Sequence, residues 1–305
     1  MKKEQGEFST DQSLSAEQLY LKELKLKSPS AKLDRSEFFR YPEDQDVIQQ
    51  TVNERIGQGQ ITRFLDIGVG NMEEPLSYLV AAQKSAKTYN LPLADAVDLE
   101  LIDIRPKNEV NVKYGLGKSS ESGLGKAFMS DKEWTNVSKK PIMPRPNHVD
   151  SFELSADSGE YEFSDEIKHY IDQRMSDPSK AKFNQSIEEY IQNYSGEGYD
   201  VVACNNVLQH LGGLTHYNSP FKDRGQAVEN YQRYFQVVDG ILNLVKPGGI
   251  AIIHTEGSIK SNDMFGKHAS EDILPMSANF NVNFIKIKSG IYKKLTEGNN
   301  AERES

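Results

Sequence analysis

Apolar positions along the chain follow two patterns, short continuous runs and longer stretches with helical spacing. The short runs are rich in Val, Ile and Leu, and they predict strands buried on both faces. These runs are residues 61–67, 97–103, 198–204, 250–254, 280–288 and 291–295. Helical spacing predicts helices at residues 44–56, 75–89 and 226–245. Because strands and helices alternate before a hairpin-like end, we expect an α/β fold with a doubly wound, mostly parallel sheet.

Two stretches depart from this alternation. Residues 1–33 are polar apart from one short helix that Ser15 can cap, and they predict a partly disordered N-terminal helical extension. Residues 106–182 are polar and rich in Lys, Ser and Pro, and we interpret them as a long insertion after the second strand. Within it the pattern predicts two short strands and a helix, at residues 152–155, 161–163 and 165–175. The main domain is then 34–295, and 296–305 is a disordered tail.

Composition limits the classes of partner. The chain has 305 residues, and its 45 acidic against 36 basic residues give a net charge of -9, which argues against a general nucleic-acid binder. Cys204 is the only cysteine, so an intramolecular disulfide framework and a multi-cysteine metal site are excluded. No apolar run reaches the roughly 20 residues of a membrane span, and the N-terminus has no apolar signal stretch. We therefore expect a cytoplasmic protein, and the sequence does not indicate its oligomeric state.

The residues that follow the first predicted strand form a candidate binding turn. In an open α/β sheet, ligands bind beyond the carboxyl ends of the strands. Gly68 and Gly70 follow the strand, and the next helix opens with Glu73 and Glu74. The glycines let the backbone approach a ligand, although they also suit an ordinary tight turn. Met72 stands where a dinucleotide-binding turn would have its third glycine, and the glutamates repel a pyrophosphate. A cationic or zwitterionic ligand therefore suits this turn better than NAD(P) or a nucleoside triphosphate.

Polar residues also follow the next two strands. Asp103 ends the second strand, where a carboxylate can accept hydrogen bonds from both ribose hydroxyls of an adenosine, or be merely solvated. Asn205 and Asn206 follow the third run, where they line the ligand groove or cap the next turn. We expect these residues to lie at the same edge of the sheet as the glycine turn.

Together these motifs resemble class I S-adenosylmethionine-dependent methyltransferases, and more narrowly the bacterial CheR-type chemotaxis receptor methyltransferases. That family carries Thr-x-Phe-Phe-Arg, Gly-Glu-Glu-Pro-Tyr-Ser and Cys-Arg-Asn-Val-Leu motifs. In the same order, this chain has Ser36–Arg40, Glu73–Ser77 and Cys204–Leu208. The closing Gly290–Lys293 also resembles that family's last strand. The resemblance implies a seven-stranded Rossmann-like methyltransferase fold and S-adenosyl-L-methionine as cofactor.

The resemblance also implies roles for individual residues. The implied cofactor site consists of Ser36, Arg40, Asp66, Gly68, Gly70, Glu73, Glu74, Asp103, Ser186, Asn205 and Asn206. Arg40, with Ser36 beside it, would reach the methionine carboxylate, and Glu73 or Glu74 would face the amino group or the sulfonium. Ser186 falls near the adenine, and Asp66 stands where many other class I methyltransferases have an acid.

Departures from the family leave the methyl acceptor open. The family's tyrosine near the acceptor is His210 here, and its receptor-facing N-terminal domain is much reduced. A carboxylate acceptor needs no base, whereas a hydroxyl or an amine gains from one. His210 is the candidate base, or it packs as a structural residue. His216 and His254 have no ligand spacing with it, so no metal site is expected.

Three functions follow from these patterns. The resemblance implies a methyltransferase that acts on a protein side chain by carboxylate O-methylation. The alternatives are O- or N-methylation of a small molecule and a non-catalytic module that binds S-adenosylmethionine.

Overall fold

The computed structural model describes the central part of the chain in several pieces. They are residues 42–115, 151–154, 161–205, 207, 235–254, 283–288 and 290–296. The predicted N-terminal extension lies outside these residues, as do 226–234 of the predicted long helix and 280–282 of a predicted strand.

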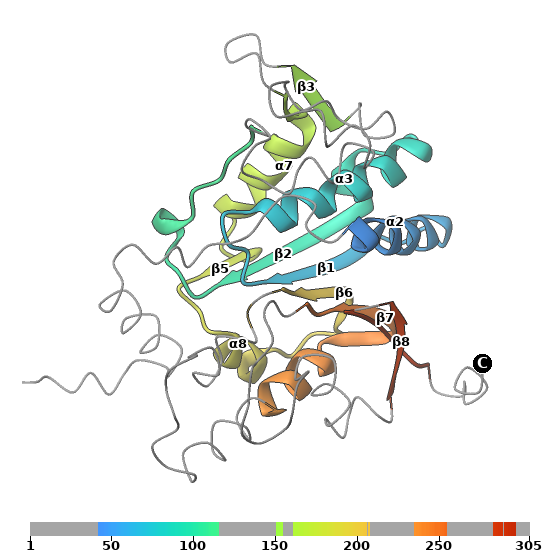
Figure 1. Ribbon diagram of the computed structural model, residues 1–305, viewed down its shortest axis with the longest axis vertical. Helices are drawn as coiled ribbons and strands as arrows, with labels where there is room; N and C mark the ends of the chain where they lie inside the picture. The colour runs from blue at the N-terminus through green and yellow to red at the C-terminus, as the bar shows by residue number, and fades with distance from the viewer. Residues whose placement is uncertain are drawn as a thin grey trace, which may run out of the picture.

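A seven-stranded sheet forms the centre of the molecule, with the strand order β5-β2-β1-β6-β7-β9-β8 (Figure 1). Its strands are β1 (Thr62–Ile67), β2 (Val97–Asp103), β5 (Ala181–Phe183), β6 (Tyr199–Cys204), β7 (Val245–Ile252), β8 (Phe284–Lys288) and β9 (Ile291–Lys294). The strands from β5 to β7 pair in parallel, and β9 runs antiparallel to both β7 and β8. This arrangement confirms the predicted doubly wound, mostly parallel, seven-stranded Rossmann-like sheet.

Helices cover both faces of the sheet (Figure 1). One face carries α2 (Pro42–Gly57), α3 (Glu73–Thr88) and α7 (Asp165–Ser176), while the other carries α8 (Ile187–Asn193) and the helical residues 235–243. Neighbouring side chains of β1 alternate between two cores, since Phe64 packs with the first layer and Leu65 with the second. Burial on both faces explains why the central strands are continuous apolar runs. None of the described helices has the length and apolar character of a membrane span.

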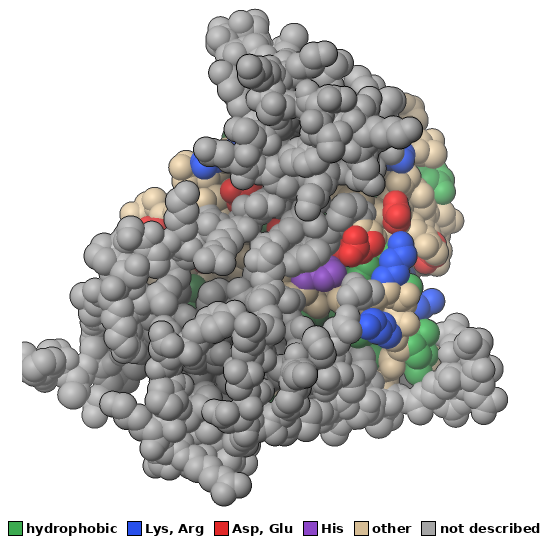
Figure 2. All heavy atoms as spheres, viewed as in Figure 1, with side chains coloured by type: hydrophobic (Ala, Val, Ile, Leu, Met, Phe, Trp, Pro, Cys, Tyr) green, Lys and Arg blue, Asp and Glu red, His purple; other side chains and the backbone are tan. Residues whose placement is uncertain are grey.

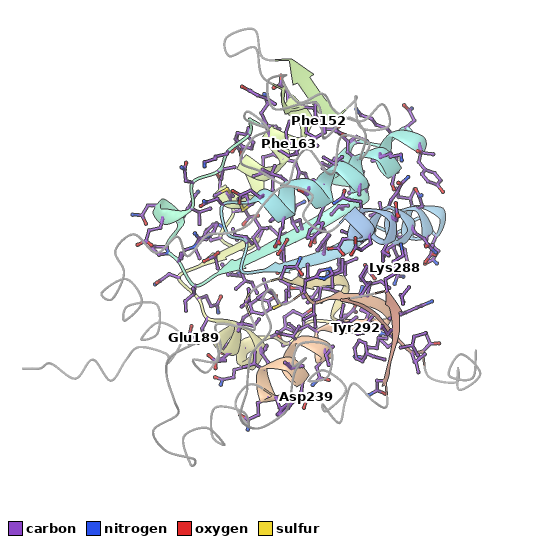
Figure 3. The ribbon with its side chains drawn as sticks, viewed as in Figure 1. Phe152, Phe163, Glu189, Asp239, Lys288 and Tyr292 are labelled. Atoms are coloured by element: carbon purple, nitrogen blue, oxygen red, sulfur yellow. The ribbon has the colours of Figure 1, made fainter. Side chains whose placement is uncertain are left out.

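The residues between β2 and β6 contribute one more strand to the central sheet than was predicted. The expected short strands are present as β3 (Phe152–Leu154) and β4 (Tyr161–Phe163), an antiparallel pair in which Phe152 and Phe163 lie against each other (Figure 3). The expected helix is α7, which packs against α3. Strand β5, however, was not predicted, although it forms the sheet edge beside β2. Short elements α4 (Leu93–Ala96) and η1 (Lys107–Glu109) flank β2.

The boundary between the long helix and β7 was predicted wrongly. The helix was expected to continue to Val245, but its helical residues end at 243 and β7 already begins at Val245. The pairing of β6 with β7 shifts register here, so that the Pro-Gly-Gly segment bulges inside the strand. Gly248 has a φ of 77°, and a Cβ on Gly249 would lie 2.9 Å from the Asp200 carbonyl oxygen. These glycines therefore permit a bulged strand where the pattern indicated a helix end.

Candidate functional site

The strand order reverses between β1 and β6. From β1 the chain continues through β2 to β5 on one side, and it returns to β6 on the other side of β1. Such a reversal opens a crevice at the carboxyl ends of the two strands, where ligands of α/β proteins bind. Gly68 follows β1 and Asn205 follows β6, so two of the predicted site segments flank this crevice.

The glycine turn after β1 has a left-handed backbone at three positions. Gly68, Gly70 and Met72 have φ values of 76°, 56° and 73°. A Cβ on Gly68 would come within 2.1 Å of Val207 Cγ2, so close packing as well as the backbone requires glycine there. Met72 is fully buried immediately before α3. Gly70 contacts the residue that was predicted to bind the ribose, because its backbone N–H donates to Asp103 Oδ2 at 3.2 Å.

Asp103 joins the glycine turn to the end of β2, and Arg105 shares its carboxylate. Asp103 is buried, and Arg105 approaches it with Nε 3.1 Å from Oδ1 and Nη2 3.1 Å from Oδ2. Arg105 Nη2 also donates to the Gly70 carbonyl oxygen. Asp103 therefore lies at the predicted strand end, but its oxygens already accept hydrogen bonds from Arg105, which was not predicted at the site. An arginine two residues after a strand-end aspartate was the signal available for it.

Buried carboxylates lie beside the turn, on β1 and at the start of α3. Asp66 is 1% exposed, and its Oδ2 has no hydrogen-bond partner among the described residues. Burial raises the pKa of Asp66 well above its usual range, and the negative charges of Glu74, Asp103 and Asp44 raise it further. Glu73 and Glu74 are also buried, and Glu74 is the one whose charge acts on Asp66. Carboxylates in such a setting need protons or a bound cation.

A closed ring of hydrogen bonds, here named the Asp44 ring, lies at the same edge. His254 Nε2 is 2.9 Å from Asp44 Oδ1, and the Tyr78 hydroxyl donates to Asp44 Oδ2 at 3.2 Å. Asn205 Nδ2 donates to the Tyr78 hydroxyl, and Asn205 Oδ1 accepts from the His254 backbone N–H at 3.1 Å. All four side chains are buried. Asn205 thus lies at the predicted edge, but both ends of its amide are used within the ring.

The pKa of Asp44 is raised within this ring. Burial raises the pKa of Asp44 and outweighs the lowering effects of His254 and Tyr78. The same environment raises the pKa of Tyr78 well above its usual range, because Tyr78 is buried and faces the charges of Asp44, Glu74 and Asp66. The Asp44 ring and the buried carboxylates therefore form one electrostatic unit.

Ser186 has a structural function in the described residues. It is the N-cap of α8, where its hydroxyl accepts from the Glu189 backbone N–H and the Glu189 carboxylate accepts from the Ser186 backbone N–H. This capping box uses the side chain that was predicted near the adenine. The other predicted site residues, Ser36, Arg40, Asn206 and His210, lie outside the described residues. Within the described part of the chain, no group of three or more His, Cys, Asp or Glu residues could hold a metal ion.

Asp44, Tyr78 and His254 were missed as site residues. His254 lies two residues after the end of β7, close enough for the rule that identified Asp103 and Asn205, but it was considered only as a metal ligand. Tyr78 lies one helical turn after Glu74 on α3. Asp44 carries no sequence signal, because its place depends on how α2 packs against α3.

Comparison with known proteins gives only distant similarities. No family model and no curated protein matches this sequence. Similar solved structures include an O-methyltransferase family protein from Burkholderia thailandensis, with 11% identity over 84% of this chain and a TM-score of 0.36. They also include the N-methyltransferase NodS from Bradyrhizobium japonicum WM9, with 11% identity over 85% of this chain and all of NodS, and a TM-score of 0.34. The O-methyltransferase NovP is 11% identical over 92% of this chain and 99% of its own, with a TM-score of 0.36.

This chain spans 56% of the Burkholderia protein. At such identities the likeness concerns the fold, and any activity has to be argued from this chain's own residues.

Proposed function

We propose that this protein is an S-adenosylmethionine-dependent methyltransferase. The observation that carries the proposal is the cluster of buried acidic side chains at the switch point, in which Asp66 Oδ2 has no hydrogen-bond partner among the described residues. A ligand with positive charge relieves this arrangement, whereas a phosphate would be repelled. S-adenosylmethionine carries an ammonium group, a sulfonium cation and a ribose diol, which are the groups that this edge of the sheet can accommodate.

The residues present fit this cofactor. Asp103 would accept hydrogen bonds from the ribose hydroxyls, with the Gly70 backbone beside it. Asp66 and Glu74 would face the ammonium and sulfonium charges. Arg105 holds both Asp103 oxygens, so it has to yield at least one of them to a ribose. When bound, the cofactor supplies an electrophilic methyl group, and the protein's task is to align the acceptor with it and to exclude water.

The acceptor is the finer part of the proposal. The CheR-like motifs favour a protein carboxylate, such as a glutamate side chain. The alternative is O- or N-methylation of a small molecule. The third hypothesis is a binding module without activity. It predicts the same cofactor affinity but no turnover.

Calorimetry with S-adenosylhomocysteine tests the cofactor site directly. We expect the wild-type protein to bind it, and Asp103→Asn to lose roughly 10-fold or more in affinity, because a charge-assisted hydrogen bond contributes about 1.5–3 kcal/mol. Asp95→Asn is the matched control, since Asp95 is exposed on α4. ATP should not compete. Absence of binding by the wild-type protein, or equal affinity in Asp103→Asn, would contradict the proposed function.

Labelled methyl transfer in a lysate then separates the acceptors. Label in protein that is released by mild base indicates carboxyl methyl esters and supports the CheR-like hypothesis. Label that is found only in small molecules supports the small-molecule alternative, and label that stays attached to protein contradicts carboxylate methylation. No label above background from a protein that binds the cofactor supports the non-catalytic module.

A further inference from the structure

A cavity of about 600 Å³ lies at the amino ends of the strands, at the opposite end of the sheet from the proposed cofactor site. Its wall includes the second residue of each of the parallel strands β1, β2, β6 and β7, and residues from the last turns of α2 and α7. Six of its lining side chains are charged, and these are the cationic Arg55, Arg63, Arg174 and Lys246 and the acidic Asp98 and Asp200. Cations therefore outnumber acids in the cavity wall.

Asp98, on β2, is shared by two cations. Arg174 Nη1 lies 2.6 Å from Asp98 Oδ1, and Lys180 Nζ lies 2.7 Å from the same oxygen. Burial raises the pKa of Asp98, but the hydrogen bonds and charges of Lys180 and Arg174 outweigh burial, and the pKa lies below its usual range. Asp98 is therefore ionised at neutral pH, and its single negative charge balances one of the two cations.

Asp200, on β6, holds two cations in the same way. Its Oδ1 lies 2.8 Å from Arg55 Nη2 and 3.7 Å from Lys246 Nζ. Its Oδ2 accepts a hydrogen bond from the Arg63 backbone N–H at 2.8 Å. Asp200 is buried, whereas Arg55 and Lys246 are partly exposed and line the cavity. The carboxylate thus fixes two cations in the wall and again balances only one of them.

Arg63, on β1, adds a cation whose ion pair is long. Its guanidinium carbon lies 4.9 Å from the centroid of the Tyr199 ring, and its Nη2 is 3.8 Å from Glu100 Oε1. The other oxygen of Glu100 accepts hydrogen bonds from the hydroxyls of Tyr190 and Tyr199. A guanidinium that stacks on an aromatic ring presents a planar fork of N–H donors, which matches the oxygens of a carboxylate or a phosphate.

The positive surplus of this cavity contrasts with the rest of the chain. The chain has a net charge of -9, and Figure 2 shows acidic and basic side chains close together on the face of the molecule that it displays. Just outside the cavity lining, Lys180 and Glu100 carry opposite charges, and Asp177 is fully exposed to water, which screens its charge. One cation on each acid would satisfy the carboxylates, and a partly exposed ion pair contributes little to stability. The fold therefore does not explain the second cation on each acid.

Apolar surface accompanies these charges. Ile61, directly before β1, lines the cavity, and 48% of its surface is exposed. Ala94 on α4 is also exposed and lines the same cavity. Sites for small molecules combine apolar walls with a few fixed polar groups, and they have volumes of about 300–1,000 Å³. This cavity has both kinds of wall and a volume in that range.

We propose that this cavity binds a small organic anion that carries two negative charges on oxygen atoms beside an apolar group. Two negative charges match the excess of four cations over two carboxylates in the lining. Phosphate monoesters and dicarboxylates share this chemistry, and the guanidinium groups of the wall suit both. The site is independent of the proposed function, since it lies at the other end of the sheet from the cofactor.

Titration calorimetry of the full chain tests the site, with phenyl phosphate and phthalate as the two dianions and benzoate as the singly charged control. The experiment is run at about pH 8, where a phosphate monoester carries nearly two charges. We expect saturable binding of at least one dianion, and an affinity for benzoate that is at least roughly 10-fold weaker. The affinity for the dianion should fall as the salt concentration rises. The dianion that binds more tightly distinguishes a phosphate site from a dicarboxylate site.

Arg174→Gln and Lys246→Gln test the cavity wall. Each substitution removes one cation and leaves its acid paired with another, because Asp98 keeps Lys180 and Asp200 keeps Arg55. Each should weaken binding of the dianion by roughly 10-fold or more, as expected for loss of a charge-assisted hydrogen bond. Lys107→Gln, at an exposed lysine in η1 beyond the carboxyl end of β2, is the control that should bind like the wild type. Thermal unfolding shows whether each variant is folded.

Methyl NMR with labelled isoleucine locates the bound anion. The signal of Ile61, assigned from its absence in Ile61→Val, should shift as the dianion is added. Ile287 on β8 is the matched control, because it is also an exposed isoleucine, at 43%, and it does not line this cavity. Its signal should stay unchanged.

Several results would overturn the proposal. They are absence of saturable binding of both dianions by the folded protein, equal affinity for benzoate, and unchanged affinity in both folded cavity variants. A shift of Ile287 without one of Ile61 would also overturn it. Binding of a polyanion such as heparin, with no binding of either dianion, would indicate an extended basic surface instead of this site. Failure to bind S-adenosylhomocysteine counts against the proposed function and leaves this proposal standing.

Discussion

Replacing Asp66 by Asn should stabilise the protein in the absence of ligand and weaken its binding of the cofactor. Asp66 is almost fully buried, its Oδ2 has no described hydrogen-bond partner, and neighbouring carboxylates surround it. The amide of Asn has nearly the same shape and no charge to desolvate, and it removes the repulsion by those carboxylates. The substitution therefore removes a destabilising charge without leaving a cavity.

The magnitude follows from proton linkage. Burial and the nearby acids raise the pKa of Asp66 in the folded state above its value in the unfolded chain. Between these two pKa values the folded state binds more protons than the unfolded state, so stability falls as the pH rises. The free energy of unfolding decreases by about 1.4 kcal/mol for each pH unit of that interval. Above the folded pKa the penalty is constant, and below the unfolded pKa it is absent.

Urea unfolding of the wild-type protein, Asp66→Asn and the exposed control Asp95→Asn at several pH values between 4 and 9 measures this effect. The difference in stability between Asp66→Asn and wild type should grow with pH and then level off. Asp44, whose pKa is also raised, contributes to the pH slope of all three proteins; because its charge interacts with that of Asp66, its contribution is smaller in Asp66→Asn, and this part of the difference also grows with pH. A difference that stays constant with pH, or shrinks as the pH rises, would refute the reasoning. Calorimetry should show weaker binding of S-adenosylmethionine by Asp66→Asn.

Three further substitutions separate structure from binding at the same edge. Ser186→Ala removes the capping box of α8 and should cost about 1 kcal/mol in thermal unfolding, with no change in the dissociation constant of S-adenosylhomocysteine; weaker binding would give Ser186 the predicted role at the adenine. Gly68→Ala should destabilise the protein by about 1–3 kcal/mol, because the position has a positive φ and the added Cβ clashes with Val207. Denaturation of the double variant with Val207→Ala should show that only the part due to the clash is restored. Arg105→Ala frees Asp103 for the ribose and should tighten binding of S-adenosylhomocysteine; weaker binding in calorimetry would show that Arg105 itself holds the ligand.

The central strands could be predicted because both faces of the sheet are covered. Strands β1, β2 and β6 match their apolar runs to within a residue, since most positions along them are buried by one layer or the other. Strand β5 could not be found in this way. It has three residues, Ala181 to Phe183, and a lysine at its middle, so it has neither the length nor the pattern of a strand. Its place is determined by pairing with β2 at the edge of the sheet.

The residues of the candidate site, like the strands, could be predicted only in part. Asp103, Asn205 and the glycine turn were found because the carboxyl ends of parallel strands meet at one edge, which is a property of topology alone. The partners of these residues were not found. Arg105 had a local signal, its spacing of two residues from Asp103, whereas Asp44 takes its place through packing between α2 and α3, which no spacing in the sequence encodes.

Acidic side chains have different partners at the two ends of the sheet, and this contrast supports the proposed position of the cofactor. At the amino ends of the strands, Asp98 pairs with Arg174 and Lys180, and the buried Asp200 pairs with Arg55. These acids have cations of their own and satisfy the fold.

At the carboxyl ends the position of Asp66 is a core position by geometry. It lies two residues after Phe64 on β1, and side chains two apart on a strand point to the same face, so an apolar residue there would pack into the first core. Among the described residues Asp66 has no ion pair, and Asp44 has only His254, whose charge depends on its protonation. Within the described residues, folding alone gives no reason to keep these carboxylates, because neutral residues of similar size would be more stable. The proposed function supplies such a reason, since a cationic cofactor bound where β1 and β6 part would meet these charges.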